Sequence, residues 1–357
     1  MSLSSVSELA GEISAVAPRQ LFSSPDAIAS VANHWSEWHR FWHGPAHLRA
    51  LLTEIVAGTS GEERDALVVA AIYHDAIYNP RAADNEEASA ILLQRDALDA
   101  SHPVIRQAVE IIVESKWDAP PVSRLGQRFF ELDARQLSDE CPLAERMAYE
   151  RAIFREYQWV SWRTYRGKRV EFLRSWGEKF PAHRRGVAEC LQLMRALQPR
   201  IAIYPGSFDP FHIGHLSILR QAEQSFDKVV VALGLNRQKA SEGSVEERRA
   251  RVADQLRFHE VAAFSGLLSQ YLDSLDAPAT VLRGVRDGTD LEAELRYARF
   301  LNDLRPGTSV VWIGCEPAWQ HISSSAVREL EAIESHSGAR YIPNAATIYG
   351  VDHLEIT

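Results

Sequence analysis

The pattern of apolar residues changes character at residues 197–200, and this change constrains the fold more than any other feature of the chain. Before it, apolar residues recur every three to four positions, as at residues 48–55 and 105–113, which is typical of amphipathic helices. Pro199 is expected to end the last of these helices. After it, short apolar runs alternate with helical patterns, which predicts a parallel α/β sheet.

The 357 residues are enough for two domains at roughly 100–200 residues each. We therefore predict an all-α helical bundle over residues 1–198, followed by an α/β domain over residues 199–357. The expected strands of the second domain lie at residues 201–204, 228–233, 260–264, 280–282 and 309–313. Helical patterns separate them, for example at residues 216–224, 245–256 and 291–304.

Charge and cysteine usage exclude several classes of protein. The formal charge of −9 argues against a general nucleic-acid or membrane-surface binder, so we expect neither as a partner. No apolar run approaches the roughly 20 residues of a membrane helix, and residues 1–20 show no signal-peptide pattern. Cys141, Cys190 and Cys315 are widely spaced and odd in number, which predicts buried free thiols and a cytoplasmic protein rather than a disulfide framework.

Residues 204–216, Y-P-G-S-F-D-P-F-H-I-G-H-L, are the most informative stretch of the second domain. They follow the first expected strand and open the first helix, where α/β sheets bind ligands. Gly206 permits a tight turn, and Gly214 lets a phosphate approach the backbone closely. His212 and His215 lie three residues apart at a helix start, so both imidazoles can face one bound group and donate hydrogen bonds to phosphate oxygens.

Three further segments follow in order: N-R-Q-K at residues 236–239, R-G-V-R at 283–286 and I-S-S-S-A-V-R-E at 322–329. With residues 204–216 they resemble the pantetheine-phosphate adenylyltransferases of the cytidylyltransferase-like superfamily, whose signature is G-x-F-D-P-x-H-x-G-H. The resemblance covers about residues 201–345. It implies a Rossmann-like fold and transfer of AMP from ATP to 4′-phosphopantetheine, which yields dephospho-coenzyme A and pyrophosphate.

The resemblance also implies roles for individual residues. His215 would stabilise the transition state with help from Lys239, and Arg283 would hold phosphopantetheine or the transferring phosphate. The nucleotide would be bound by Ser207, Phe208, His212, Arg286, Glu294, Ser323, Ser324 and Ser325. Mg²⁺ is expected to bridge the β- and γ-phosphates of ATP. Because the family assembles into oligomers, we expect a homo-oligomer.

Some segments depart from the family on the acceptor side. Residues 334–340 replace its usual Gly-Gly-Asp, and Gly266-Leu267-Leu268 stands where an acidic residue is common. Two alternatives therefore stay open. The acceptor is a different phosphorylated molecule, such as nicotinamide mononucleotide, or the domain senses a nucleotide without turnover and regulates the first domain.

The first domain carries a histidine–aspartate pattern. His43 and His47 lie four apart and share a helix face, and His74-Asp75 ends the apolar stretch 67–73. A buried, unpaired Asp is costly, and a metal offsets that cost. Asp133 offers a further carboxylate after an apolar approach.

This order resembles the HD-domain metal-dependent phosphohydrolases, through R-F-W-H-G-P-A-H at residues 40–47, Y-H-D-A-I-Y-N-P at 73–80 and D-N-E-E-A-S-A at 84–90. The resemblance implies that His43, His74, Asp75 and Asp133 hold a divalent ion such as Mn²⁺, Mg²⁺ or Fe, with His47 auxiliary. The ion would activate water for attack on a phosphate ester or anhydride.

Two departures keep alternatives open here. Trp117 stands where the family carries a His, and Arg135 stands at the second Asp of its D-x-D-L. The domain is therefore an active hydrolase, a metal-binding regulatory domain, or a metal-free helical scaffold. Which carboxylate position near residue 133 binds the ion is open, as is the substrate.

Overall fold

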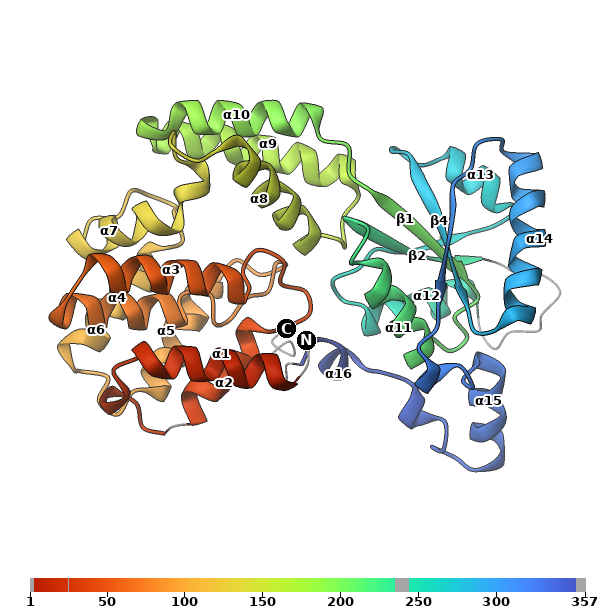
Figure 1. Cartoon of the computed structure of the whole chain (residues 1–357), viewed down its shortest axis with the longest axis horizontal. Coiled ribbons are helices and arrows are strands. Elements are labelled where there is room, and N and C mark those ends of the chain that lie inside the picture. The colour runs from red at the N-terminus through yellow and green to blue at the C-terminus, as the bar shows by residue number, and fades with distance from the viewer. Residues whose placement is uncertain (1–2, 25, 235–243, 351–357) are drawn as a thin grey trace. The chain divides into compact units, whose positions relative to one another are not determined.

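The computed structural model describes residues 3–24, 26–234 and 244–350, which form two compact units (Figure 1). Of these residues, the N-terminal unit contains those up to Glu156, Lys168–Ala196 and the last two, 349–350. The C-terminal unit contains Tyr157–Gly167 and those from Leu197 to Ile348. The units thus alternate along the chain, and the domain limits at 198/199 stay a prediction.

The N-terminal unit is helical, as its apolar periodicity predicts, whereas its membership of the HD type stays a prediction. Its α-helices are α1 (Leu3–Val16), α2 (Asp26–Trp35), α3 (Pro45–Gly58), α4 (Gly61–Tyr73), α5 (Asn85–Asp96), α6 (Pro103–Glu114), α7 (Arg124–Asp133), α8 (Leu143–Glu156) and α10 (Arg184–Ala196). Helix α9 (Trp162–Lys179) starts in the C-terminal unit and ends here.

Helix α4 is the centre of this unit's core. Residues 66–73 are all fully buried, because this part of the helix is apolar on every side and the helix packs against α3, α5, α6 and α7. Each fully buried large aliphatic side chain among them contributes about 1.5–3 kcal/mol relative to exposure. The helix therefore fixes the position of His74 and Asp75, which follow its last residue directly.

The C-terminal unit contains a five-stranded parallel sheet, which confirms the predicted α/β fold. Its strands are β1 (Ile201–Gly206), β2 (Lys228–Gly234), β3 (Val261–Phe264), β4 (Ala279–Val285) and β5 (Val310–Gly314). Their order is β3-β2-β1-β4-β5. Chain order thus runs outward in opposite directions from β1 and β4, and ligands of open α/β sheets bind at such a switch point, beyond the carboxyl ends of the strands.

The helices of this unit are α11 (Ile213–Ala222), α12 (Val245–Gln255), α13 (Leu268–Asp273), α14 (Gly288–Leu304), α15 (Ser324–Ile333) and α16 (Ala345–Tyr349), whose last residue groups with the N-terminal unit. Strands β1 and β2 are buried almost throughout, with Ile203 paired to Val230 and Gly206 to Leu233. Strand β4 runs three residues beyond the predicted 282, so Arg283 lies near its carboxyl end.

A segment from earlier in the chain completes the C-terminal unit. The side chain of Gln158 donates to Glu223 and accepts from the backbone N–H of Val229 at 3.0 Å. The ammonium of Lys228, which is buried, donates to the carbonyl of Gln158 and to that of Val160 at 2.7 Å. Residues 157–160 therefore satisfy buried polar groups at the start of β2.

The sequence also predicts no membrane-spanning helix and no disulfide framework. None of the helices in the part of the chain that the structure describes is long and apolar enough to cross a membrane. The three cysteines are free and buried.

Candidate functional site

A cavity of about 400 Å³ lies at the carboxyl ends of β1 and β4. This volume is in the range of small-molecule sites. Its walls include Ser207, Phe208, His212, His215, Arg283, Arg286, Glu294, Ser323, Ser324 and Ser325. The structure therefore brings together every predicted nucleotide-site residue that it describes. Lys239, the remaining one, lies outside the described residues.

The two histidines of the turn lie against each other at the start of α11. Their ring centroids are 3.7 Å apart and nearly parallel, at 22°. The Nδ1 of His215 accepts the backbone N–H of His212 at 3.3 Å, so the proton of the neutral His215 ring is on Nε2. A Cβ at position 214 would lie 3.1 Å from the His212 ring, so Gly214 also leaves room for this imidazole.

Both rings are neutral at pH 7. Burial, helped by the positive charge of Arg286, lowers the pKa of His212 to about 4. Burial, together with His212 and Arg286, lowers the pKa of His215 well below its usual value. The Nδ1 of His212 is buried and has no hydrogen-bond partner among the described residues. A phosphate group in this cavity would supply oxygens that accept hydrogen bonds from the two rings. Its negative charge would also favour protonation of these imidazoles.

The two predicted phosphate-binding arginines are each paired with a carboxylate. Arg283 donates to both oxygens of Glu294 at 2.6 and 2.5 Å, and to the carbonyl of Pro205 at 3.1 Å. Arg286 donates to both oxygens of Asp290 at 2.7 and 3.0 Å. Arg283 and Glu294, for which the sequence suggests separate ligand contacts, therefore hold each other beside the cavity.

The serines at the far wall belong to the start of α15. The hydroxyl of Ser323 accepts the backbone N–H of Ala326 at 3.1 Å and caps the helix. The hydroxyl of Ser324 donates to the carbonyl of Pro210 at 3.0 Å. These two bonds place the amino end of α15 at the cavity, where helix N–H groups favour an anion.

Arg248 is a wall residue for which the sequence motifs predict no role. It is 3% exposed, and its Nη1 donates to the carbonyl of Ser207 at 3.1 Å. Its Nε has no partner, and no carboxylate pairs with it, among the residues that the structure describes. Ser244 and Glu247 cap the start of α12 reciprocally and thereby fix the helix turn that carries Arg248. A buried cation without an acidic partner marks a place for an anion.

A second cluster lies in the N-terminal unit. Ligand atoms of His47, His74 and Asp75 all lie within 4.8 Å of one another. Asp133 joins them: its Oδ1 is 2.9 Å from His47 Nε2 and 3.6 Å from His74 Nε2. The buried Nε2 of His74 makes no well-formed hydrogen bond, although Asp75 Oδ2 is 3.0 Å away. Two imidazoles and two carboxylates around an unsatisfied nitrogen fit a divalent cation.

The electrostatics of this cluster follow from its mutual pairing. Burial opposes ionisation of Asp75 and Asp133. The charges of His74 and His43 beside Asp75, and the hydrogen bond from His47 to Asp133, outweigh it and lower both pKa values. Burial likewise opposes protonation of His74, but the two carboxylates raise its pKa well above the usual value. The carboxylates are therefore ionised, as ligands of a divalent ion must be.

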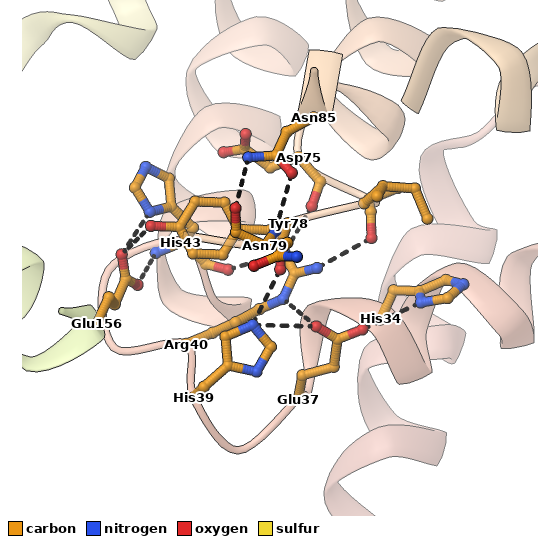
Figure 2. Close-up of polar contacts among 12 residues, drawn as sticks. His34, Glu37, His39, Arg40, His43, Asp75, Tyr78, Asn79, Asn85 and Glu156 are labelled. Atoms are coloured by element: carbon orange, nitrogen blue, oxygen red, sulfur yellow. Dashed lines mark hydrogen bonds and ion pairs between the residues drawn. The ribbon is translucent and has the colours of Figure 1, made fainter. Parts of the chain in front are cut away.

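His43, expected with the ligands, is bound differently. Its Nδ1 donates to Oε2 of Glu156 at 2.7 Å (Figure 2). His47, expected as auxiliary, lies inside the cluster. Arg135, the residue at the second Asp position, lies 3.8 Å from Glu145 and outside the cluster. Asp133 is thus the carboxylate of this segment that reaches the histidines.

Comparisons with known proteins concern the C-terminal unit. Residues 203–330 match the model of the family described as cytidylyltransferase-like. A phosphopantetheine adenylyltransferase of Chloroflexus aggregans is 40% identical over 138 residues, which are 38% of this chain and 84% of that protein. One of Actinobacillus pleuropneumoniae is 37% identical over 148 residues, covering 40% and 91%. A solved lipopolysaccharide core biosynthesis protein of Thermoplasma volcanium aligns with 33% of this chain and 97% of its own, at 22% identity and a TM-score of 0.26.

Proposed function

The chain belongs, through residues 203–330, to the cytidylyltransferase-like nucleotidyltransferases, and on this premise we propose that its C-terminal unit adenylylates 4′-phosphopantetheine. ATP would supply the AMP group, and dephospho-coenzyme A and pyrophosphate would be the products. The observation that carries the proposal is the single cavity lined by residues from three of the four motif segments, 204–216, 283–286 and 322–329. The fourth segment, 236–239, lies outside the described residues.

The chemistry suits the walls of this cavity. A phosphate oxygen of the acceptor attacks the α-phosphorus of ATP, the bond to the bridging oxygen breaks, and pyrophosphate leaves. Catalysis then consists of aligning two anions and neutralising the charge that develops between them. The neutral imidazoles of His212 and His215 can donate hydrogen bonds to the phosphates, and Arg248 adds a buried positive charge. Mg²⁺ would arrive with ATP and offset the charge of its β- and γ-phosphates.

The acceptor is tested by measuring pyrophosphate release with ATP and a panel of acceptors. We expect turnover with 4′-phosphopantetheine and none with nicotinamide mononucleotide. Turnover with another acceptor alone would remove the coenzyme A assignment and keep the nucleotidyltransferase. Calorimetric ATP binding without turnover of any acceptor would favour the nucleotide sensor instead. Homo-oligomer formation and a cytoplasmic location remain part of this proposal, and sedimentation of the purified chain tests the first.

The cluster in the N-terminal unit supports a second function, that of a metal-dependent phosphohydrolase. His47, His74, Asp75 and Asp133 would hold the ion, Mn²⁺, Mg²⁺ or Fe. Such an ion lowers the pKa of a bound water and so supplies a nucleophile. Elemental analysis after purification without chelators, together with Mn²⁺ titration, tests the site. A protein that takes up no Mn²⁺ would support the metal-free scaffold.

A further inference from the structure

Glu156 is the last residue of α8, and its side chain is fully buried. Its Oε1 accepts three consecutive backbone N–H groups, those of Phe41, Trp42 and His43, at 2.8, 2.6 and 2.9 Å. Its Oε2 accepts the hydroxyl of Tyr78 at 2.7 Å and the Nδ1–H of His43 at 2.7 Å. One carboxylate therefore binds five donors on two segments far from it in the sequence, and Figure 2 shows His43 and Tyr78 beside it.

These bonds explain why the charge is tolerated and what it does. Burying a carboxylate is costly, and hydrogen bonds from five donors offset the cost. The three N–H groups belong to the irregular connection between α2 and α3, where no helix or strand supplies them with acceptors. Without Glu156 they would be left unsatisfied at the point where the chain enters the helix that carries His47.

The same carboxylate fixes one tautomer of His43. An ionised carboxylate only accepts hydrogen bonds, so Nδ1 of His43 carries a proton, and Nε2 is the nitrogen left for another partner. Figure 2 shows this second ring nitrogen on the side turned away from Glu156. The ring lies 4.4 Å from that of Tyr78 and 6.3 Å from that of His47, between centroids. Its side chain is 23% exposed, so a ligand from solvent can contact it.

Arg40 ties this connection to the other ligand-bearing segment. Its guanidinium is buried and paired with Glu37 at 2.9 Å. It also donates to the carbonyls of Asp75, Ala76 and His43 at 2.5, 3.0 and 3.3 Å (Figure 2). His43 and Asp75 are thus held to a common frame from two sides, by an anion and by a cation.

We propose that Glu156 is a positioning residue of the N-terminal site, which fixes residues 41–43 and the Nδ1–H tautomer of His43 and so presents His43 Nε2 to a phosphate ester bound at the His47–His74–Asp75 cluster. The inference rests on the proposed hydrolase function. Carboxylate partners of this kind fix the orientation of imidazoles at metal sites, and their loss costs about 10–100-fold in metal affinity or activity.

The test is the protonation of the His43 ring in the full chain. Long-range ¹H–¹⁵N correlation spectra of histidine-labelled protein, assigned with His43→Gln, show which ring nitrogen bears the proton. We expect Nδ1–H in the wild type. In Glu156→Gln the amide NH₂ group replaces an oxygen that accepts hydrogen bonds. We expect Nδ1 of His43 to accept a hydrogen bond from this NH₂ group, which moves the ring proton to Nε2. Tyr78→Phe, which removes a different donor from the same oxygen, is the control and is expected to keep Nδ1–H.

Two further measurements separate this role from simple support of the fold and from the proposed function. We expect Glu156→Gln to bind Mn²⁺ with a Kd within about 3-fold of the wild type, while kcat for bis(p-nitrophenyl) phosphate falls at least 10-fold. If Nδ1 of His43 carries no proton in the wild type, the role of Glu156 is overturned, and this measurement needs no variant. An unchanged tautomer in Glu156→Gln would overturn it as well. A wild type that binds no Mn²⁺ would overturn the hydrolase function, and the spectra would still decide the role of Glu156.

Discussion

The buried His212 gives the C-terminal unit a defined sensitivity to acid. Its pKa is about 4 in the folded protein, against an ordinary value of 6.5. Between these values the unfolded chain holds more protons than the folded one, so acid favours unfolding. The stability is complete above about pH 6.5, declines as the pH falls, and stops declining below about pH 4. Protonation of this ring alone makes the free energy of unfolding about 2 kcal/mol lower at pH 5 than at pH 8.

The assay compares the wild type with His212→Gln at pH 8 and pH 5. Urea unfolding is followed by pulsed hydrogen exchange and mass spectrometry, so that peptides from β1 and β2 report on the C-terminal unit alone. The difference in unfolding free energy between variant and wild type should change by about 2 kcal/mol in favour of the variant as the pH falls. His321→Gln, at an exposed histidine of the same unit, is the control and should follow the wild type. A difference that is the same at both pH values would refute the reasoning.

Three further predictions concern the two sites. His215→Ala should lower kcat for pyrophosphate release at least 100-fold with little change in Tm, because it removes a donor to the transferring phosphate; an unchanged rate would contradict the role proposed for this ring. Arg248→Met should weaken ATP binding about 10-fold or more by calorimetry, because a charged hydrogen bond is worth about 1.5–3 kcal/mol, whereas the exposed Arg296→Met should bind as the wild type does. Asp133→Asn should weaken Mn²⁺ binding at least 10-fold in a titration, and equal affinity in this variant and in the exposed Asp99→Asn would remove Asp133 from the site.

The parts of the structure that the sequence predicts are those set by local pattern. Short apolar runs between helices predict the parallel sheet, and residues 204–216 carry their turn, cap and imidazoles within one stretch. The three serines are equally local, because they form the N-cap and the first two residues of α15. Such features depend on neighbours in the chain, so no long-range pairing is needed to find them.

The parts that it misses depend on which distant groups meet. Arg248 reaches Ser207 only because α12 returns to the end of β1, a contact across 41 residues. Glu156 reaches His43 across 113 residues. His43 and His47 share one helical spacing, and nothing in that spacing says which imidazole faces the carboxylate at residue 133. Arg283 at a strand end pairs with Glu294 in a helix, so neither the two-residue period of a strand nor the 3.6-residue period of a helix predicts this contact.

The contacts of Gln158 with β2 bear on how this polypeptide can be divided. A fragment trimmed to begin at residue 199 loses both carbonyls that accept from Lys228, whose side chain is 2% exposed, and leaves Glu260 as a remaining partner at 2.9 Å. It also strips Glu223 of one donor in the interior. We therefore expect a fragment cut before residue 199 to aggregate. A fragment that retains residues 157–167 should keep the sheet intact. If evolution split such a gene into two separate genes, the product carrying the sheet would need other groups to replace residues 157–167.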